Sequence, residues 1–93
     1  MQYVYVLLSE TDGQFYTGLT SDLRRRLEEH NSGEVPSTKH RTPFRLVYYE
    51  ACPSRVDAAA REKYLKTGMG KRYLKNRLKA FLGGLPRQRP SGL

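Results

Sequence analysis

The stretch FYTGLTSDLRRRLEEH, residues 15–30, decides the fold because its pattern changes from that of a strand to that of a helix. Its opening aromatic and β-branched residues predict a strand over residues 14–19, interrupted at Gly18. Its second half predicts a helix over residues 22–31. The stretch therefore predicts a strand, a turn and a basic helix in immediate succession.

The predicted helix has a recognisable start and one apolar side. Ser21 or Asp22 can act as its N-cap residue, since both side chains accept hydrogen bonds from free backbone N–H groups. Leu23, Leu27 and His30 then recur at i, i+4 and i+7, so they share the side that packs on the sheet.

Further elements are predicted on both sides of this stretch. Asp12-Gly13 is a strong signal for a hairpin turn between the first two strands. The order β-β-α-β-α-α indicates an α/β fold, an α+β sandwich in which helices flank a three-stranded, mostly antiparallel sheet. The remaining predicted elements are strands over residues 2–8 and 44–50 and helices over about 54–66 and 71–82.

Length and composition predict one domain over residues 1–83, followed by a flexible basic tail over residues 84–93. No run of about 18 apolar residues occurs, and the apolar opening lacks a basic leader, so neither a membrane span nor a secretory signal is expected. The single Cys52 cannot form an internal disulfide. We expect a cytoplasmic protein without a membrane partner.

The charge balance predicts a polyanionic partner. Seventeen Lys and Arg residues against nine Asp and Glu residues leave a formal net charge of +8. Basic residues cluster as RRR, KHR and GKRYLKNRLK, which is typical of nucleic-acid binding. The alternatives are charges that only keep the protein soluble, or a membrane-surface role, which the lack of large exposed aromatic faces disfavours.

Two tyrosines and a glycine form the first part of a candidate site. If an even number of residues joins the two strands, Tyr5 and Tyr16 project from the same face of the hairpin. Gly18 follows Tyr16 on that face, where a glycine permits close approach of a ligand or another group. A simple aromatic pair and a simple bulge are the structural alternatives.

Arg26 and His30 form the second part, because residues four apart stack on one side of a helix. Arg26, at the edge of the apolar side, suits a bidentate phosphate contact, or it only covers the sheet with its aliphatic stem. Arg24 and Arg25 point further toward water. For His30 the simplest structural role is a hydrogen-bonded core histidine.

Glu62 is the third part. The helix containing it is predicted to pack through Val56, Ala60 and Tyr64, with Glu62 pointing away from that seam. Its carboxylate either forms a surface pair with Lys66 at i, i+4 or binds a hard cation such as Mg²⁺. Spacing alone leaves both roles open.

Together these segments resemble the GIY-YIG endonuclease superfamily, in particular its small stand-alone bacterial members. The resemblance covers about residues 2–82. Two departures occur, with Tyr3 where the first motif has glycine and Thr17 where the second has isoleucine, both at non-catalytic positions of the family. The motifs that carry the resemblance are Tyr3-Val4-Tyr5, Tyr16-Thr17-Gly18, the set Gly18, Thr20, Leu23, Arg26 and His30, the run TKHRTPFRLVYYE, and Glu62 followed by KTGMGKRYLKNRL.

The resemblance implies a role for each residue of the site. Glu62 would hold one divalent metal, Mg²⁺ or Mn²⁺, and Tyr5 would act as general base toward the attacking water. Tyr16 would orient the water or the scissile phosphate, and Arg26 would neutralise charge on the phosphoryl oxygens. His30 would assist proton transfer or contact the phosphate.

The resemblance also points to Asn76 in the last helix as a support for the metal or the phosphate, with a solvated helix residue as the alternative. Beyond the catalytic set, the residues expected to contact nucleic acid are Gly18, Thr20, Arg24, Arg25, Lys39, Arg41, Lys71, Arg72 and Lys75.

These expectations combine into a metal-dependent endonuclease that hydrolyses phosphodiester bonds of DNA, selecting its substrate by structure or with weak sequence preference. RNA cleavage is left open, as is the role in DNA repair, recombination or turnover. The alternatives are a non-catalytic nucleic-acid-binding module and a catalytic subunit whose protein partner supplies substrate choice. A monomer is the simplest expectation.

Overall fold

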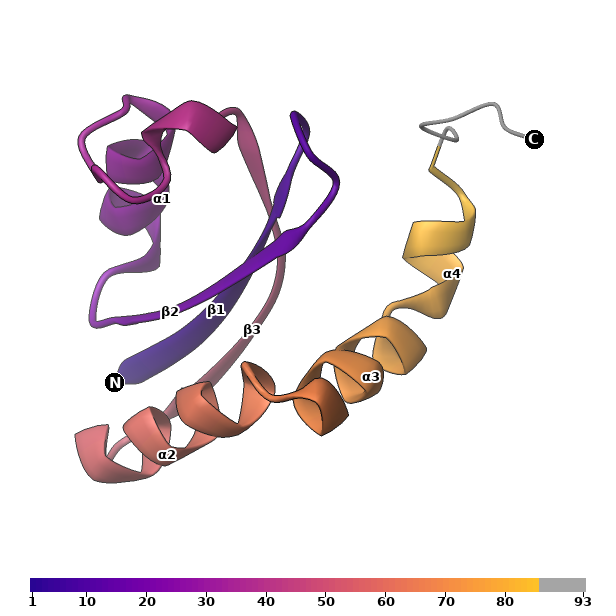
Figure 1. The fold of residues 1–93 in the computed structure, drawn as a ribbon. Coiled ribbons are helices and arrows are strands. Elements are labelled where there is room, and N and C mark those ends of the chain that lie inside the picture. The colour runs from indigo at the N-terminus through magenta and orange to yellow at the C-terminus, as the bar shows by residue number, and fades with distance from the viewer. Residues whose placement is uncertain (86–93) are drawn as a thin grey trace.

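A computed structural model describes residues 1–85 of the chain. It contains a three-stranded sheet in the order β2-β1-β3, formed by β1 (Gln2–Ser9), β2 (Phe15–Thr20) and β3 (Phe44–Cys52) (Figure 1). Both strand pairs are antiparallel. The predicted α+β fold with an antiparallel sheet is therefore confirmed, and β2 is one edge of that sheet.

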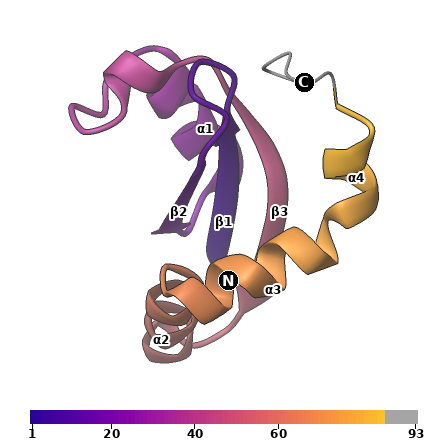
Figure 2. The ribbon, with the colours of Figure 1, turned by 45° about the vertical axis from the view of Figure 1, so that its right-hand side comes forward.

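The helices follow the predicted order. One side of the sheet carries α1 (Leu23–Asn31), and the other carries α2 (Arg55–Leu65) and α3 (Gly68–Arg77), as Figure 1 and Figure 2 show. A short 3-10 turn, Lys39–Arg41, precedes β3, and α4 (Lys79–Gly83) follows α3.

The predicted single helix over residues 71–82 is in fact two helices, and its start is earlier. Thr67 caps α3, since its hydroxyl accepts a hydrogen bond from the Gly70 N–H at 3.1 Å. At Leu78 the backbone leaves the helical region, with φ −105° and ψ 17°, so α3 ends and α4 begins there. The apolar residues keep helical spacing on both sides of Leu78, so their spacing does not reveal the change of helix there.

The interior has two clusters because the side chains of β1 alternate between its two faces. Val4 and Val6 pack against Ala58, Leu65 and Leu74 from α2 and α3. On the opposite face, Tyr5, Leu7 and Phe44 pack against Tyr16, Leu46 and the leucines of α1, Leu23 and Leu27. Both faces of the central strand are covered, which explains why residues 4–9 are all buried.

The predicted packing of α2 is wrong. Val56 is 79% exposed, and Ala60 is also exposed, whereas Ala58 and Leu65 are completely buried. Ala58, Glu62 and Leu65 lie at i, i+4 and i+7, so Glu62 belongs to the row that faces the sheet rather than pointing away from it. Ala58 lets the helix approach β1 and β2 closely, and this orientation also buries Leu65 completely.

Gly70 is required where α3 leaves α2. A Cβ atom at this position would collide with the carbonyl oxygen of Tyr64 and with the backbone of Leu65. The two helices therefore cross in contact at a buried glycine. Of the tail predicted over residues 84–93, residues 86–93 lie outside the described part. Within residues 1–85, no helix has the length and apolar character needed to cross a membrane.

Candidate active site

The hairpin register brings the two motif tyrosines together. Leu8 lies opposite Phe15, so an even number of residues joins the strands, and Tyr5 pairs with Gly18 while Leu7 pairs with Tyr16. Tyr5 and Tyr16 therefore share one face, as predicted, with ring centroids 6.3 Å apart. The Tyr16 ring also packs edge-on against His30 at 4.9 Å.

Gly18 lies directly opposite Tyr5, and its lack of a side chain makes room for the tyrosine. A Cβ atom there would collide with the Tyr5 hydroxyl and with the edge of its ring. Pairing between β1 and β2 continues through this position without a register shift. The glycine therefore serves close approach, and the alternative of a bulge is wrong.

A chain of hydrogen bonds leads inward from Tyr5. Its hydroxyl lies 2.9 Å from His30 Nε2, and His30 Nδ1 lies 2.8 Å from the Thr38 hydroxyl. The Thr38 hydroxyl donates to the Val35 carbonyl at 3.4 Å. Since Thr38 uses its proton on Val35, it accepts from His30 Nδ1–H, and Nε2 is left to accept from Tyr5. The contacts thus assign the Nδ1-protonated tautomer and orient Tyr5 as a donor.

His30 is fully buried and neutral at neutral pH. Burial, with a smaller contribution from the positive charge of Arg26, lowers the pKa of His30 to about 4, and Glu29 opposes this weakly. A buried ring with both nitrogens bonded cannot contact a phosphate. Of the two roles considered for His30, assistance to proton transfer is the one that fits its contacts.

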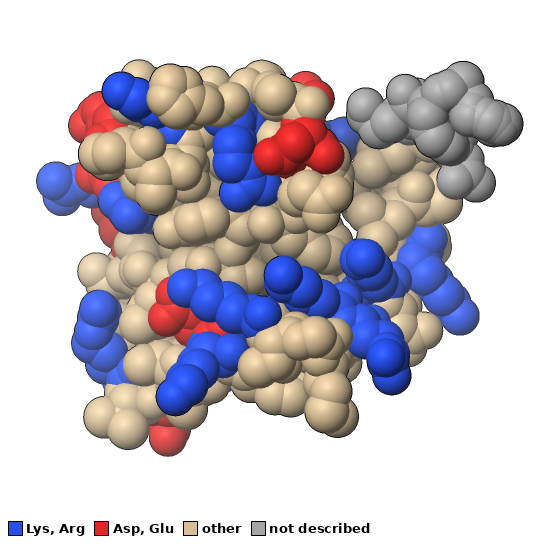
Figure 3. Space-filling view, in the orientation of Figure 1, with Lys and Arg blue, Asp and Glu red and all other residues tan. Residues whose placement is uncertain are grey.

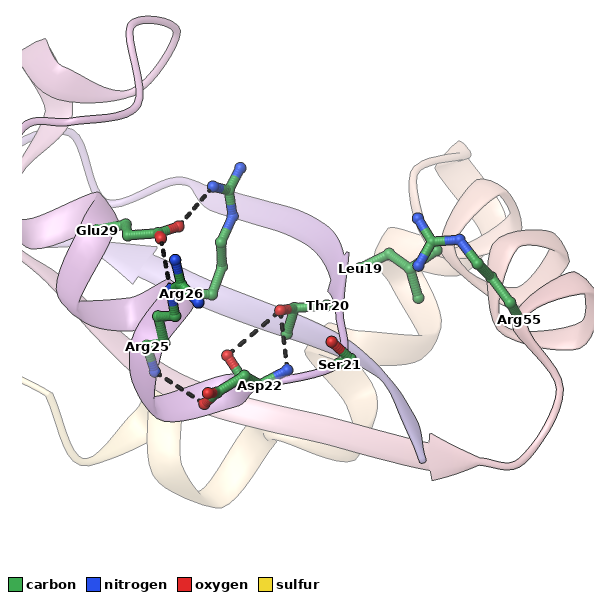
Figure 4. Close-up of a pocket in the computed structure, with 8 residues that line it drawn as sticks. All are labelled: Leu19, Thr20, Ser21, Asp22, Arg25, Arg26, Glu29 and Arg55. Atoms are coloured by element: carbon green, nitrogen blue, oxygen red, sulfur yellow. Dashed lines mark hydrogen bonds and ion pairs between the residues drawn. The ribbon is translucent and has the colours of Figure 1, made fainter.

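Arg26 connects Tyr5 to the surface. Its Nε donates to the Tyr5 hydroxyl at 3.3 Å and its Nη1 donates to Glu29 at 2.9 Å, while its side chain remains 34% exposed. Glu29 also pairs with Arg25 at 3.2 Å, so one carboxylate orients both arginines (Figure 4). Arg26 can therefore hold Tyr5 with one edge of its guanidinium and present another edge to an anion.

Two opposing effects act on the Tyr5 hydroxyl. Burial raises the pKa of Tyr5, because a phenolate is poorly solvated there, and the hydrogen bond from Arg26 lowers it. Electrostatic interaction with Tyr16 and, more weakly, with the Glu62 carboxylate raises the pKa of Tyr5 further. Tyr5 is consequently a protonated phenol in the resting protein, and its proton is directed at His30.

Glu62 lies on α2, which packs on β1 and β2, and its charge acts weakly on Tyr5. Its side chain is 23% exposed and pairs with Lys66 at 3.1 Å. The surface pair with Lys66, one of the two roles that the sequence left open, is therefore present. Metal binding would require Glu62 to exchange this partner for the cation. The exposed lysine can move aside at little cost, since such pairs contribute only about 0.3–0.5 kcal/mol.

The donors available for a divalent metal are few. Residues 1–85 contain no group of three or more His, Cys, Asp or Glu side chains that could enclose a metal ion. Mg²⁺ is often bound by one or two carboxylates, with water and substrate phosphate oxygens completing its octahedron. The half-buried Glu62 carboxylate fits such a shared ion, not one held by the protein alone.

An open hollow of about 320 Å³ lies beside Arg26, between α1 and the start of α2 (Figure 4). We call it the site hollow; its three arginines outnumber its two carboxylates, which leaves a net positive charge. It is lined by Leu19, Thr20, Ser21, Asp22, Arg25, Arg26, Glu29 and Arg55.

The other predicted site residues lie apart from this group. Asn76 is exposed on α3 and lines a separate hollow with Met69, Arg72 and Tyr73. Within residues 1–85, no hydrogen bond joins Asn76 to Tyr5. Of the predicted nucleic-acid contacts, Thr20 and Arg25 line the site hollow, and Gly18 faces Tyr5. Arg24 and Lys39 are exposed. A hollow near the hairpin turn is lined by Arg41, Lys71 and Lys75.

Basic side chains also follow the two helices on the other side of the sheet. Figure 3 shows lysines and arginines gathered over α2 and α3 on the face seen in Figure 1. Exposed residues in these helices include Lys63, Lys66, Lys71, Arg72 and Lys75. On this face, lysines and arginines therefore outnumber acidic side chains over α2 and α3.

Sequence reasoning did not identify three residues of the site. Glu29, which orients Arg26, is three residues after it, so helical spacing could have revealed this pair. Thr38 reaches His30 from a loop, and Arg55 reaches the site hollow from α2. No local pattern indicates either contact, because both depend on how distant segments pack.

Comparisons with known proteins agree with this geometry. The family model described as the GIY-YIG catalytic domain matches residues 1–79. A UPF0213 protein of Haloquadratum walsbyi is 43% identical over 67 residues, covering 70% of this chain and 75% of the relative. A UPF0213 protein of Clostridium perfringens is 40% identical over 67 residues, covering 71% of each chain.

A solved structure is also similar to this chain. The solution NMR structure of a UPF0213 protein from Bacillus halodurans is 40% identical, with a TM-score of 0.50, and the match covers 90% of this chain and 88% of that one. The family model includes Tyr5, Tyr16, Arg26, His30 and Glu62 within its matched range. The family supports a nuclease-type function. The chain belongs to the GIY-YIG domain family.

Proposed function

We propose that this protein is a divalent-metal-dependent endonuclease that hydrolyses phosphodiester bonds of DNA. The observation that carries the proposal is the Tyr5 hydroxyl held between Arg26 Nε and His30 Nε2, at 3.3 and 2.9 Å. A buried tyrosine with a donor on one side and a proton acceptor on the other is arranged for proton transfer. The proposed setting is the cytoplasm, in DNA repair, recombination or turnover.

The attacking water gives its proton to Tyr5 while the Tyr5 proton moves to His30 Nε2. A bond forms between the water oxygen and phosphorus, and the phosphorus–oxygen bond to the leaving nucleotide breaks. The low pKa of His30 opposes this transfer in the resting protein. A substrate phosphate beside Arg26 counteracts the arginine charge that helps to depress that pKa, so substrate binding favours the transfer.

Arg26 and Glu62 both help to stabilise negative charge on the phosphate, Arg26 directly and Glu62 through a bound metal. Arg26 stabilises the charge that develops on the phosphoryl oxygens, and Glu29 keeps its guanidinium in place. Glu62 would hold Mg²⁺ or Mn²⁺, which when bound supplies Lewis acidity and stabilises negative charge on the phosphate and the leaving oxygen. Tyr16, whose ring lies against His30, orients the water or the phosphate.

The test is cleavage of labelled single-stranded, duplex and branched DNA with Mg²⁺ or Mn²⁺. We expect cutting that a chelator abolishes and that Glu62→Ala reduces by at least about 10²-fold, the lower range for losing a charged catalytic group. Glu28→Ala is the matched control, since Glu28 is exposed on α1. Equal cutting by Glu62→Ala and the parent would refute the assigned site.

A non-catalytic nucleic-acid-binding module, or a subunit that needs a protein partner, is favoured by one observation. Glu62 already pairs with Lys66, so its carboxylate has a structural role without a metal. Salt-sensitive binding of all three DNA forms, without cutting under any metal condition, would support this second function and argue against the first.

A further inference from the structure

The edge strand β2 has a positively charged hollow at each end. At its C-terminal end lies the site hollow, next to Leu19 and Thr20. At its N-terminal end, beside Phe15, lies a second hollow of about 240 Å³ between the hairpin turn and α3. We call this the hairpin hollow; it is lined by Asp12, Gln14, Phe15, Arg41, Lys71 and Lys75.

The charges of the hairpin hollow are not balanced within residues 1–85. Arg41 pairs with Asp12 at 2.6 Å and also donates to the Gln14 carbonyl, so this arginine is held rigidly. That pair lowers the pKa of Asp12 to about 2, so its carboxylate stays ionised. Lys71 and Lys75 are exposed, lie on one face of α3 at i, i+4, and form no salt bridge there.

Neither the fold nor the proposed catalysis requires these two lysines. Neighbouring cations without acidic partners repel one another, so the proximity of Lys71 and Lys75 at i, i+4 is itself unfavourable. A phosphate in the hollow would relieve that repulsion and gain charge-assisted hydrogen bonds. The chemistry of the hollow therefore matches a backbone phosphate better than a neutral ligand.

The spacing of the two hollows identifies the occupant. From Phe15 to Thr20, β2 advances five residue steps, or roughly 17 Å at about 3.4 Å per residue. Successive phosphates of one DNA strand are separated by at least the axial rise of about 3.4 Å, so the same length spans at most about five nucleotides. In Figure 1, β2 runs between α1 on one side and α2 and α3 on the other, so the two hollows lie along the same edge strand.

We propose that the hairpin hollow binds a second backbone phosphate, on the same strand as the phosphate held at Arg26 and at most about five nucleotides from it. The inference rests on the proposed function. One DNA strand would then lie along β2, with the catalytic residues at one end and a rigid anchoring point at the other. A substrate must extend far enough beyond the cut on one side to reach the hairpin hollow if it is to be held well.

The test measures binding by fluorescence anisotropy in the presence of a chelator, so that cleavage is not involved. Lys71→Glu with Lys75→Glu is compared with Lys63→Glu plus Lys79→Glu, which changes the net charge equally at exposed positions outside the hollow. We expect the hollow pair to lose about tenfold or more in affinity for a 12-nucleotide strand at low salt, with a shallower salt dependence. For a trinucleotide, too short to reach both hollows, the two variants should bind alike.

The outcomes separate this inference from the proposed function. Equal losses for both variant pairs at every strand length would overturn the hairpin hollow, whether or not the parent protein cuts DNA. A selective, length-dependent loss would support it even if no cutting is found, in which case only the proposed catalysis fails. Unchanged melting temperatures establish that both variant pairs are folded.

Discussion

Thr38→Val is the substitution that tests the hydrogen-bond chain most directly. Thr38 is 1% exposed, and its hydroxyl accepts from His30 Nδ1 at 2.8 Å while donating to Val35. Valine has a similar shape but no hydroxyl, so the change removes both contacts without opening a large cavity. The His30 Nδ1–H is then left buried without a partner.

The expected cost follows from that unpaired group. Leaving a buried donor unsatisfied costs about 1–3 kcal/mol. In a domain of this size, 1 kcal/mol lowers the melting temperature by about 4–8 °C, so a decrease of at least about 4 °C is expected. His30 also loses the contact that selects its tautomer, so Nε2 accepts the Tyr5 proton less often and cleavage slows.

Three measurements check this reasoning. Thermal unfolding gives the stability loss, ¹⁵N NMR of the His30 ring gives the tautomer, and cleavage kinetics give the chemical step. Ser37→Ala, in the same loop but exposed, is the control and should leave all three unchanged. A melting temperature within about 1 °C of the parent, with the Nδ1–H tautomer retained, would refute the assigned hydrogen-bond chain.

Gly18→Ala should destabilise the fold by about 1–3 kcal/mol in urea unfolding, because the added methyl collides with the Tyr5 hydroxyl; an unchanged midpoint would contradict that contact. Tyr5→Phe should slow cleavage while leaving DNA binding in chelator nearly unchanged, and equal rates would exclude Tyr5 as the base. Between pH 6.5 and about 4, unfolded His30 binds a proton that the folded protein excludes, so stability falls as pH falls, by at most about 3 kcal/mol. His30→Gln should remove that slope between pH 6.5 and 5, above the range in which the shifted carboxylates titrate, and persistence of the slope would assign it to another group.

Local sequence patterns correctly predicted those features of the site that depend on residues close together in the chain. The shared face of Tyr5 and Tyr16 followed from strand alternation and an even connection, and the register confirms it. Asp22 as N-cap followed from its place before the apolar spacing, and its carboxylate does accept from the Arg25 N–H at 3.1 Å. The GIY-YIG family was likewise predicted from the ordered motifs and is confirmed by the match over residues 1–79.

The predicted packing face of α2 and the predicted start of α3 were wrong, because both depend on how the helices pack in the tertiary structure. Val56, Ala60 and Tyr64 form a plausible seam by spacing, but the row that packs on the sheet is the one that contains Ala58 and Leu65. Glu62 faces inward for that reason. The roles of Asn76 and of the metal remain predictions, because side-chain positions alone do not test them.

The sequence by itself determined the order of elements, the antiparallel hairpin, the pairing of Tyr5 with Tyr16 and that of Arg26 with His30, since periodicities of two and 3.6 act within single elements. Only the tertiary structure decided that His30 is buried behind Tyr5, that Thr38 sets its tautomer, and that a cationic hollow lies at each end of β2. Those features join segments far apart in the chain, and their geometry depends on which surfaces pack closely once water is excluded.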